Sequence, residues 1–313
     1  MKLKDYVTLG NLLGGFAAVI ALFIGEFTWA CYLIYIAYIF DILDGKVAKL
    51  TGQTGDAFGP VFDTVCDFIT NSVAASFIIF YAFWKRADYP LVLAAAIAAF
   101  PLVFGTIRQA KGDVENLSFP CYWLGVPRPV LAMFALALLN SSVFEISVSP
   151  WREIAHAVAA ALIIIFSILH LSKLPFGNHH GRRWMTAMRF GAYAFLAGTP
   201  VAWLLGWLLL GMPELVYDYL LFCFIAYIFT SWAQIPAEDL RRIRDYVAGK
   251  PLLLPLVHRD SGWRSTSNAD YFLVKEWSDE KRAEALAAQQ RTQEAKEAKA
   301  GEPAAPPTEA APA

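Results

Sequence analysis

Long apolar runs separated by short polar segments fill the first 235 positions of the chain. A helix needs roughly 20 apolar residues to cross a bilayer, and lipid offers no partners for free backbone groups, so such runs are expected to be helical. The pattern therefore predicts an all-α integral membrane protein with about eight transmembrane helices. The candidate spans cover residues 10–25, 29–49, 59–83, 89–108, 128–147, 153–172, 189–210 and 214–234.

The apolar pattern ends near residue 235, which predicts a membrane domain over residues 1–235. Residues 236–278 begin with PAEDLRRIRDYVAGK, which is typical of an amphipathic helix on a membrane surface. Residues 279–313 are rich in Glu, Lys, Ala, Gln and Pro. This low-complexity composition predicts a disordered C-terminal tail.

Composition supports this division of the chain. Of the 313 residues, 57% are hydrophobic and only 17% are charged, which is too apolar for a soluble globular protein. The formal net charge of −1 gives no indication of a nucleic-acid partner.

The basic residues predict how the chain crosses the membrane. If the N-terminus is cytoplasmic, most Lys and Arg residues fall in cytoplasmic segments, and the opposite side holds only Lys85, Arg86 and Arg152. Such asymmetry favours an N-in, C-in topology with an even number of spans. We expect a bacterial cytoplasmic membrane, with the acidic stretch DILDGKVAKLTGQTGDAFGPVFDTVCD at its cytoplasmic face.

Four aspartates in that stretch have helical spacing. Asp41 and Asp44 are three residues apart, and Asp63 and Asp67 are four apart, so each pair shares one face of a helix. A short turn between the two helices can bring all four carboxylates together. Acidic residues at the membrane are costly and tend to mark function. Their mutual repulsion calls for cations, and hard oxygen ligands favour Mg²⁺ or Mn²⁺.

Two such ions about 3.5–4 Å apart form the usual arrangement for displacement at phosphorus. Gly45, Ala48 and Gly59 lie on the same helix faces and leave space beside the carboxylates, as a pyrophosphate and a nucleotide require. Lys49 follows Gly45 by one turn and can neutralise a phosphate.

The stretch resembles the signature of the CDP-alcohol phosphatidyltransferase family. DILDGKVAK, nine further residues and GPVFDTVCD match the pattern D-x-x-D-G-x-x-A-R, eight residues, G-x-x-x-D-x-x-x-D. Two positions depart from it. Lys49 replaces the usual arginine and loses its bidentate fork, and the linker is one residue longer.

The resemblance implies transfer of a phosphatidyl-type group from a CDP-linked lipid to an alcohol, with release of CMP. It implies that Asp41, Asp44, Asp63 and Asp67 bind the metal pair and that Asp67 is the general base. It implies contacts between the cytidine diphosphate and Gly45, Lys49 and Gly59. The family's first span also touches the nucleotide or lipid head group, which corresponds to Thr8–Asn11 here, with Asn11 as the expected contact.

Segments outside the signature are similar to the phosphatidylserine synthase branch, namely GTIRQAK, GVPRP and LSKLPFG. This similarity implies L-serine as the acceptor and CDP-diacylglycerol as the donor. Arg108, Lys111 and Arg128 are the expected acceptor-binding residues, since they can hold a carboxylate or a phosphate, although topology alone also explains Lys111. Glycerol 3-phosphate, an inositol phosphate and choline remain alternative acceptors.

A cation-dependent transporter is a further interpretation of the acidic cluster. Transporter sites usually lie near the middle of the bilayer, between paired broken helices. These aspartates gather at one membrane face, which favours the enzyme. Family resemblance also suggests a homodimer.

Overall fold

The computed structural model describes residues 2–52, 58–115, 122–177, 191, 193–212, 214–231, 235 and 237–248. The chain divides into two compact units, Met1–Ile235 and Pro236–Ala313. All the helices that carry the candidate site belong to the first unit. In the second unit the described part contains the helix α11 (Ala237–Val247), and the expected tail over residues 279–313 lies outside the described residues.

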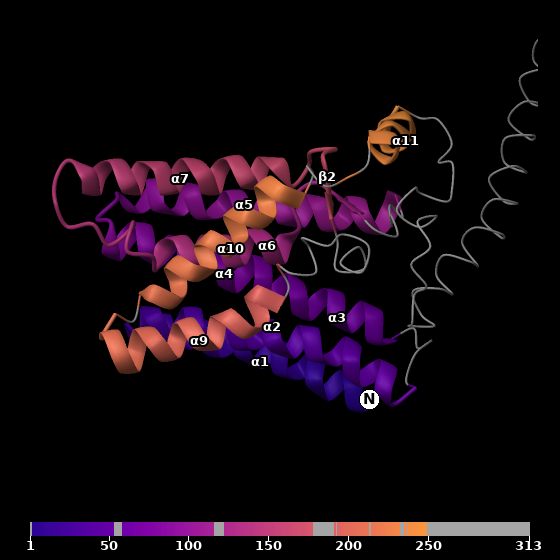
Figure 1. The fold of residues 1–313 in the computed structure, drawn as a ribbon, viewed down its shortest axis with the longest axis horizontal. Helices are drawn as coiled ribbons and strands as arrows, with labels where there is room; N and C mark the ends of the chain where they lie inside the picture. Colours follow the sequence, from indigo (N-terminus) through magenta and orange to yellow (C-terminus); the bar gives the residue numbers. More distant parts are fainter. Residues whose placement is uncertain are drawn as a thin grey trace, which may run out of the picture. The chain divides into compact units, whose positions relative to one another are not determined.

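Two long helices form the N-terminal hairpin of the first unit. α1 (Leu3–Phe23) and α2 (Phe27–Leu50) lie side by side along their length (Figure 1). Gly25 forms the turn between them with φ of +86°, a backbone conformation that glycine adopts without steric cost. Small residues let the helices approach closely, because a Cβ on Gly14 would lie only 2.8 Å from Cβ of Ala37.

The third predicted span is one continuous helical segment that changes its winding twice. It consists of α3 (Phe58–Phe68), the π-helix η1 (Ile69–Ala74), α4 (Ala75–Tyr81) and the π-helix η2 (Ala82–Arg86). α1 packs against α3, η1 and α4 in turn. The wider turns of η1 begin two residues after Asp67, and π-helical turns are frequent at functional sites.

The centre of the first unit is α6 (Arg128–Leu139), whose residues from Val130 to Leu139 are all buried. A helix that is apolar on every side needs neighbours all round, and α6 contacts α4, α7 and α10 among others. The remaining helices of this unit are α5 (Leu91–Glu115), α7 (Trp151–Leu169), α9 (Thr199–Leu204) with its flanking π-helices η4 (Ala194–Gly198) and η5 (Leu205–Leu210), and α10 (Leu215–Ser231).

The fold also contains two short strands that the sequence pattern does not predict. β1 (Tyr122–Leu124) and β2 (Pro175–Gly177) pair antiparallel, with Trp123 opposite Phe176. This ribbon joins the segment before α6 to the segment after α7. The structure is therefore mostly helical rather than wholly helical.

Each of the eight predicted spans corresponds to a helical segment, but not all of them have the length of a span. Within the described residues, five helices are long and apolar enough to cross a membrane, and α6, the segment Ala194–Leu210 and α10 are shorter. α6 has 12 residues and is about 18 Å long. The apolar helices indicate an integral membrane protein, and the five long ones are Leu3–Phe23, Phe27–Ala48, Val61–Arg86, Leu91–Lys111 and Trp151–Leu169.

Candidate metal-binding and active site

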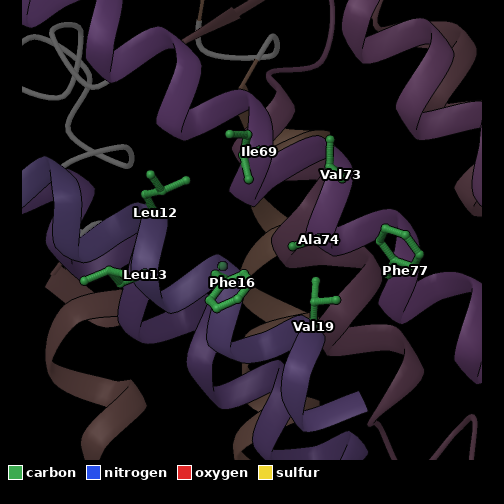
Figure 2. Close-up of a pocket in the computed structure, with 9 residues that line it drawn as sticks. Leu12, Leu13, Phe16, Val19, Ile69, Val73, Ala74 and Phe77 are labelled. Atoms are coloured by element: carbon green, nitrogen blue, oxygen red, sulfur yellow. The ribbon is translucent and has the colours of Figure 1, made fainter. Parts of the chain in front are cut away.

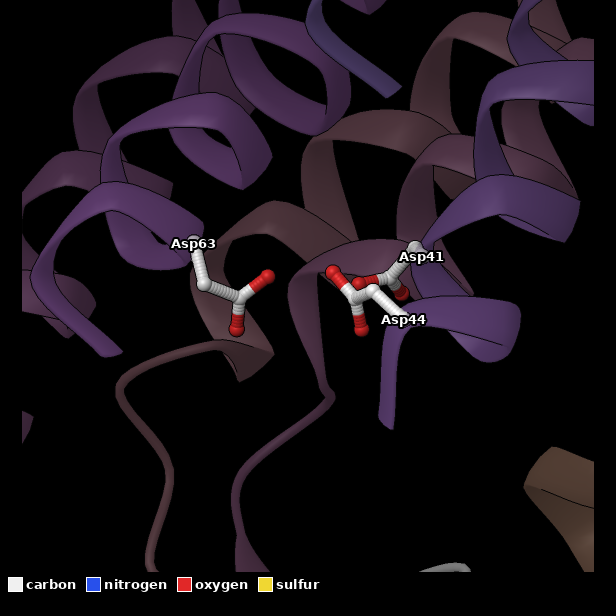
Figure 3. Close-up of side chains that lie close together, drawn as sticks. All are labelled: Asp41, Asp44 and Asp63. Carbon is white, nitrogen blue, oxygen red and sulfur yellow. The ribbon is translucent and has the colours of Figure 1, made fainter. Parts of the chain in front are cut away.

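Three aspartate side chains from two neighbouring helices meet at one point. Asp41 and Asp44 share a face near the C-terminal end of α2, and Asp63 faces them from the second turn of α3 (Figure 3). One carboxylate oxygen of each aspartate lies within 4.8 Å of the other two. The spacing of three residues in the sequence therefore brings Asp41 and Asp44 to the same place as Asp63.

Asp67 lies beside this group without belonging to it. Its Oδ1 accepts a hydrogen bond of 2.9 Å from Nδ2 of Asn11, and its carboxyl group is within hydrogen-bonding reach of Asp41. The sequence predicts four aspartates around the metal pair. In the structure three carboxylates lie together. The fourth, that of Asp67, is hydrogen-bonded to Asp41 and Asn11.

The helix α1 supplies buried polar partners to the carboxylates. Oγ1 of Thr8 donates to Oδ2 of Asp44 at 2.6 Å, and Asn11 donates to Asp67. Thr8 and Asn11 are 4% and 1% exposed, so water does not compete for these bonds. Charge-assisted hydrogen bonds of this kind fix the orientation of a carboxylate.

The donor set fits a divalent cation. All the grouped ligand atoms are carboxylate oxygens, which hard cations such as Mg²⁺ prefer. Oδ1 of Asp63 is buried and has no hydrogen-bond partner among the described residues. A buried carboxylate oxygen without a partner is costly, and a bound cation would remove that cost.

Lys4 joins the site, although its position in the sequence predicts only a topological role. Its ammonium group lies against Gly59, where a Cβ would overlap Nζ. Lys4 interacts electrostatically with Asp44 and Asp63. Lys4, Thr8 and Asn11 have spacings of four and three and therefore share one face of α1. This polar stripe on an otherwise apolar helix is the sequence feature that could have indicated a site role for Lys4.

The two glycines of the signature differ in their surroundings. Gly59 is crowded by Lys4, whereas a Cβ on Gly45 would meet nothing within 4 Å. Gly45 thus borders open space next to Asp44. Lys49 lies in α2, and its side chain is outside the part of the chain that the structure describes.

Arg108 holds together the segment that precedes α6. Its Nη1 donates to the backbone carbonyl oxygens of Leu124 and of His170, the latter at 2.9 Å. Nδ1 of His170 donates in turn to the carbonyl of Val126 at 2.6 Å. These contacts fix the turn at Gly125, whose φ is +72°.

Of the expected acceptor-binding residues, Arg128 interacts with one of the carboxylates. It begins α6 and interacts electrostatically with Asp67, whereas Lys111 is exposed near the end of α5. Gly105 makes room between Arg128 and the third span. A Cβ on Gly105 would lie 3.2 Å from Oγ of Ser72 and 3.7 Å from Cδ of Arg128.

A buried polar strip follows Asp67 in η1, and the apolar pattern of the sequence does not predict it. Thr70, Asn71 and Ser72 are all buried. Thr70 donates to the carbonyl oxygen of Asn11 at 3.3 Å. Oδ1 of Asn71 and Oγ of Ser72 have no hydrogen-bond partner among the described residues. Such atoms are rare in a folded interior, and Oγ of Ser72 borders Gly105, as Cδ of Arg128 does.

Comparison with known proteins adds an independent line of support. The family model described as CDP-alcohol phosphatidyltransferase matches residues 1–213. The chain is 29% identical over 161 residues to a CDP-diacylglycerol–serine O-phosphatidyltransferase of Helicobacter pylori, a match that covers 51% of this chain and 65% of the relative. The chain thus spans just under two thirds of that relative's length.

Two further relatives cover larger shares of their own length. A CDP-diacylglycerol–serine O-phosphatidyltransferase of Methanocaldococcus jannaschii is 25% identical over 203 residues, covering 64% of this chain and 86% of the relative. A phosphatidylinositol phosphate synthase of Mycobacterium bovis is 25% identical over 167 residues, covering 53% and 74%. The names of these relatives share the phosphatidyl group, and they name serine in two cases and inositol phosphate in the third.

Proposed function

The chain belongs to the CDP-alcohol phosphatidyltransferase family, and we propose on this basis that it transfers a phosphatidyl group from CDP-diacylglycerol to L-serine, releasing CMP. The observation that carries the proposal is the convergence of Asp41, Asp44 and Asp63, with Asp67 beside them. The relatives from Helicobacter pylori and Methanocaldococcus jannaschii support serine as the acceptor. An inositol phosphate is the second candidate acceptor, because a mycobacterial relative is named a phosphatidylinositol phosphate synthase.

We propose that Asp41, Asp44, Asp63 and Asp67 hold Mg²⁺ or Mn²⁺ in a two-metal site. When bound, the ions would neutralise negative charge on the pyrophosphate and on the departing CMP. Thr8 and Asn11 orient two of the four carboxylates from α1. Partners of this kind around metal ligands typically change metal affinity 10–100-fold when they are removed.

Asp67 is our proposed general base. The hydroxyl oxygen of the acceptor attacks the β-phosphorus of CDP-diacylglycerol, a new P–O bond forms, and the bond from that phosphorus to the CMP oxygen breaks. The hydroxyl proton passes to the Asp67 carboxylate. The hydrogen bond from Asn11 keeps that carboxylate aimed at the acceptor.

The remaining roles concern recognition. We propose that Asn11, Gly45, Lys49 and Gly59 contact the cytidine diphosphate, and the open space beside Gly45 supports this assignment. We assign acceptor binding to Arg108, Lys111 and Arg128. Arg128 is the best supported of these, because it lies near Asp67. The two carbonyl contacts of Arg108 support a positioning role for its guanidinium.

We propose that the chain crosses a bacterial cytoplasmic membrane eight times, with both termini (N-in and C-in) and the carboxylates on the cytoplasmic side. The shorter apolar helices would then cross as part of the bundle rather than as independent spans. The membrane domain comprises residues 1–235, and residues 236–278 form a surface segment. A homodimer is the proposed assembly.

An acceptor panel tests the function. Purified full-length protein receives CDP-diacylglycerol, Mg²⁺ or Mn²⁺ and one alcohol at a time, and CMP release is measured. We expect CMP with L-serine and much less with inositol phosphate, glycerol 3-phosphate or choline. CMP release with another alcohol but not with serine would overturn the acceptor. Absence of CMP with every alcohol and both metals would refute the transfer reaction itself.

A further inference from the structure

The ammonium group of Lys4 lies beside the carboxylate site, and contacts on two helices fix its place. On α3 it lies against Gly59, where a Cβ would overlap Nζ. Gly59 is four residues before Asp63 and so shares its face of the helix. On α1, Lys4 is one turn before Thr8, whose Oγ1 donates to Oδ2 of Asp44. The ammonium therefore lies near two of the proposed metal ligands, and it interacts electrostatically with both.

Contacts beyond Lys4 hold α1 against the third span. Phe16 of α1 and Val73 of η1 line the same apolar groove, whose volume is about 420 Å³ (Figure 2). Between this groove and the carboxylates, Oγ1 of Thr70 donates to the carbonyl oxygen of Asn11 at 3.3 Å. α1 contacts α3, η1 and α4 in addition. We therefore expect α1 to keep its place when the charge of Lys4 is removed.

The charge of Lys4 is unfavourable for its own helix. Lys4 lies in the first turn of α1, at the positive end of the helix dipole, where acidic residues are preferred. Asp5 in the same turn follows that preference. It is buried, and its Oδ2 accepts a hydrogen bond of 2.6 Å from the backbone nitrogen of Lys2. Its Oδ1 lies 3.5 Å from the position that a Cβ of Gly59 would take, which Nζ of Lys4 overlaps. Carboxylates, rather than the helix dipole, therefore hold the ammonium at this place.

We propose that Lys4 is a built-in counter-charge of the carboxylate site, which competes with divalent cations and sets how tightly they bind. The inference rests on the proposed function, because that function assigns metal ions to these carboxylates. The ammonium offsets part of the negative potential of Asp44 and Asp63, and it repels a cation that approaches them. It also relieves the repulsion among the aspartates, which stabilises the folded protein when divalent cations are scarce. Lys4 thus acts through two metal ligands and needs no contact with a substrate.

A charge-removing variant tests the proposal through metal binding. Lys4→Met keeps much of the length of the side chain and loses its charge. Lys46→Met removes the same charge from an exposed position on α2, two residues beyond Asp44 and on a different face of that helix. Mn²⁺ binding to the purified full-length proteins, without substrate, is measured by electron paramagnetic resonance. Lys4→Met should bind Mn²⁺ about tenfold more tightly than wild type, because a unit charge several ångströms from a divalent ion is felt even through water. Lys46→Met should stay within about twofold, because its charge is exposed and screened.

The direction of the change distinguishes competition from a structural role. A substitution that merely disturbs the site weakens Mn²⁺ binding, whereas loss of a competing charge strengthens it. Unchanged or weaker Mn²⁺ binding in Lys4→Met would overturn the counter-charge and leave the metal site standing. Wild-type protein that binds no Mn²⁺ would refute the metal site itself, and the counter-charge with it.

Thermal unfolding gives a second measurement that involves no turnover. In EDTA, Lys4→Met should lower the unfolding midpoint by about 2–4 °C relative to wild type, because the aspartates lose a neighbouring positive charge. Saturating Mn²⁺ should then raise the midpoint more in Lys4→Met than in wild type, because a more tightly bound ion stabilises the folded state more. Lys46→Met should match wild type in both conditions. Equal midpoints of Lys4→Met and wild type in EDTA, with an equal gain from Mn²⁺, would contradict the proposal.

Discussion

The hydrogen bond between Thr8 and Asp44 gives a quantitative test of the metal site. Thr8→Val keeps the shape of the side chain and removes the hydroxyl that donates to Oδ2 of Asp44 at 2.6 Å. The same hydroxyl also lies 3.2 Å from the carbonyl oxygen of Lys4, but it carries one proton, and the shorter contact is the one to the carboxylate. The substitution therefore acts mainly on Asp44.

The expected magnitude follows from the burial of this bond. A hydrogen bond to a charged group contributes about 1.5–3 kcal/mol, and Thr8 is too buried for water to replace it. Converted at 1.4 kcal/mol for each factor of ten, the loss corresponds to roughly 10–150-fold in an equilibrium constant. This range agrees with the 10–100-fold that is typical for residues that support metal ligands.

Two assays follow the effect. CMP release is measured against Mn²⁺ concentration, and Mn²⁺ binding to the purified protein is measured by electron paramagnetic resonance. Thr8→Val should raise the half-saturating Mn²⁺ concentration about 10–100-fold in both. Thr106→Val is the control, because Thr106 donates only to the carbonyl of Leu102 on the exposed side of α5. Unchanged Mn²⁺ affinity in a folded Thr8→Val protein would refute the role of α1 in holding Asp44.

Three further outcomes are expected. Asp67→Asn should abolish CMP release while the protein keeps its wild-type elution volume and unfolding midpoint; measurable turnover would exclude Asp67 as the base. EDTA should stop the reaction, and excess Mg²⁺ or Mn²⁺ should restore it, because four carboxylates cannot gather around a phosphate without cations; turnover in chelated protein contradicts this. Gly125→Ala should lower the thermal midpoint more than Gly211→Ala. Both glycines have positive φ, a cost of about 1–2 kcal/mol for alanine, but only at Gly125 would a Cβ overlap the carbonyl oxygen of His170. Equal midpoints would show that the turn before α6 is not tightly packed.

The sequence predicts those features of the site that depend on periodicity. Asp41 and Asp44 share a helix face because they are three residues apart, and the structure places Asp63 opposite them. Eight apolar runs likewise correspond to helical segments. Both results follow from the 3.6-residue repeat, which is a property of the chain itself.

Features that depend on packing were not predictable in this way. The central position of α6 follows from neighbours that are distant in the sequence, and its run of buried residues resembles a lipid-facing span. The pairing of Trp123 with Phe176 joins segments some fifty residues apart. The contact of Lys4 with Gly59 depends on how α1 and α3 approach each other, and a lysine near the N-terminus is otherwise explained by topology.

The same division of polar and apolar residues occurs on α1 and on the third span. On α1 the polar stripe of Lys4, Thr8 and Asn11 gives way to apolar residues from Leu12. On the third span the acidic stripe ends at Asp67, but the buried polar side chains of Thr70, Asn71 and Ser72 continue the polar surface by one turn. Asn11 is eight residues beyond the start of α1, or about 12 Å along the helix. The change from polar to apolar therefore comes at Leu12 on α1 and after Ser72 on the third span, and the carboxylates lie where both helices still carry polar side chains.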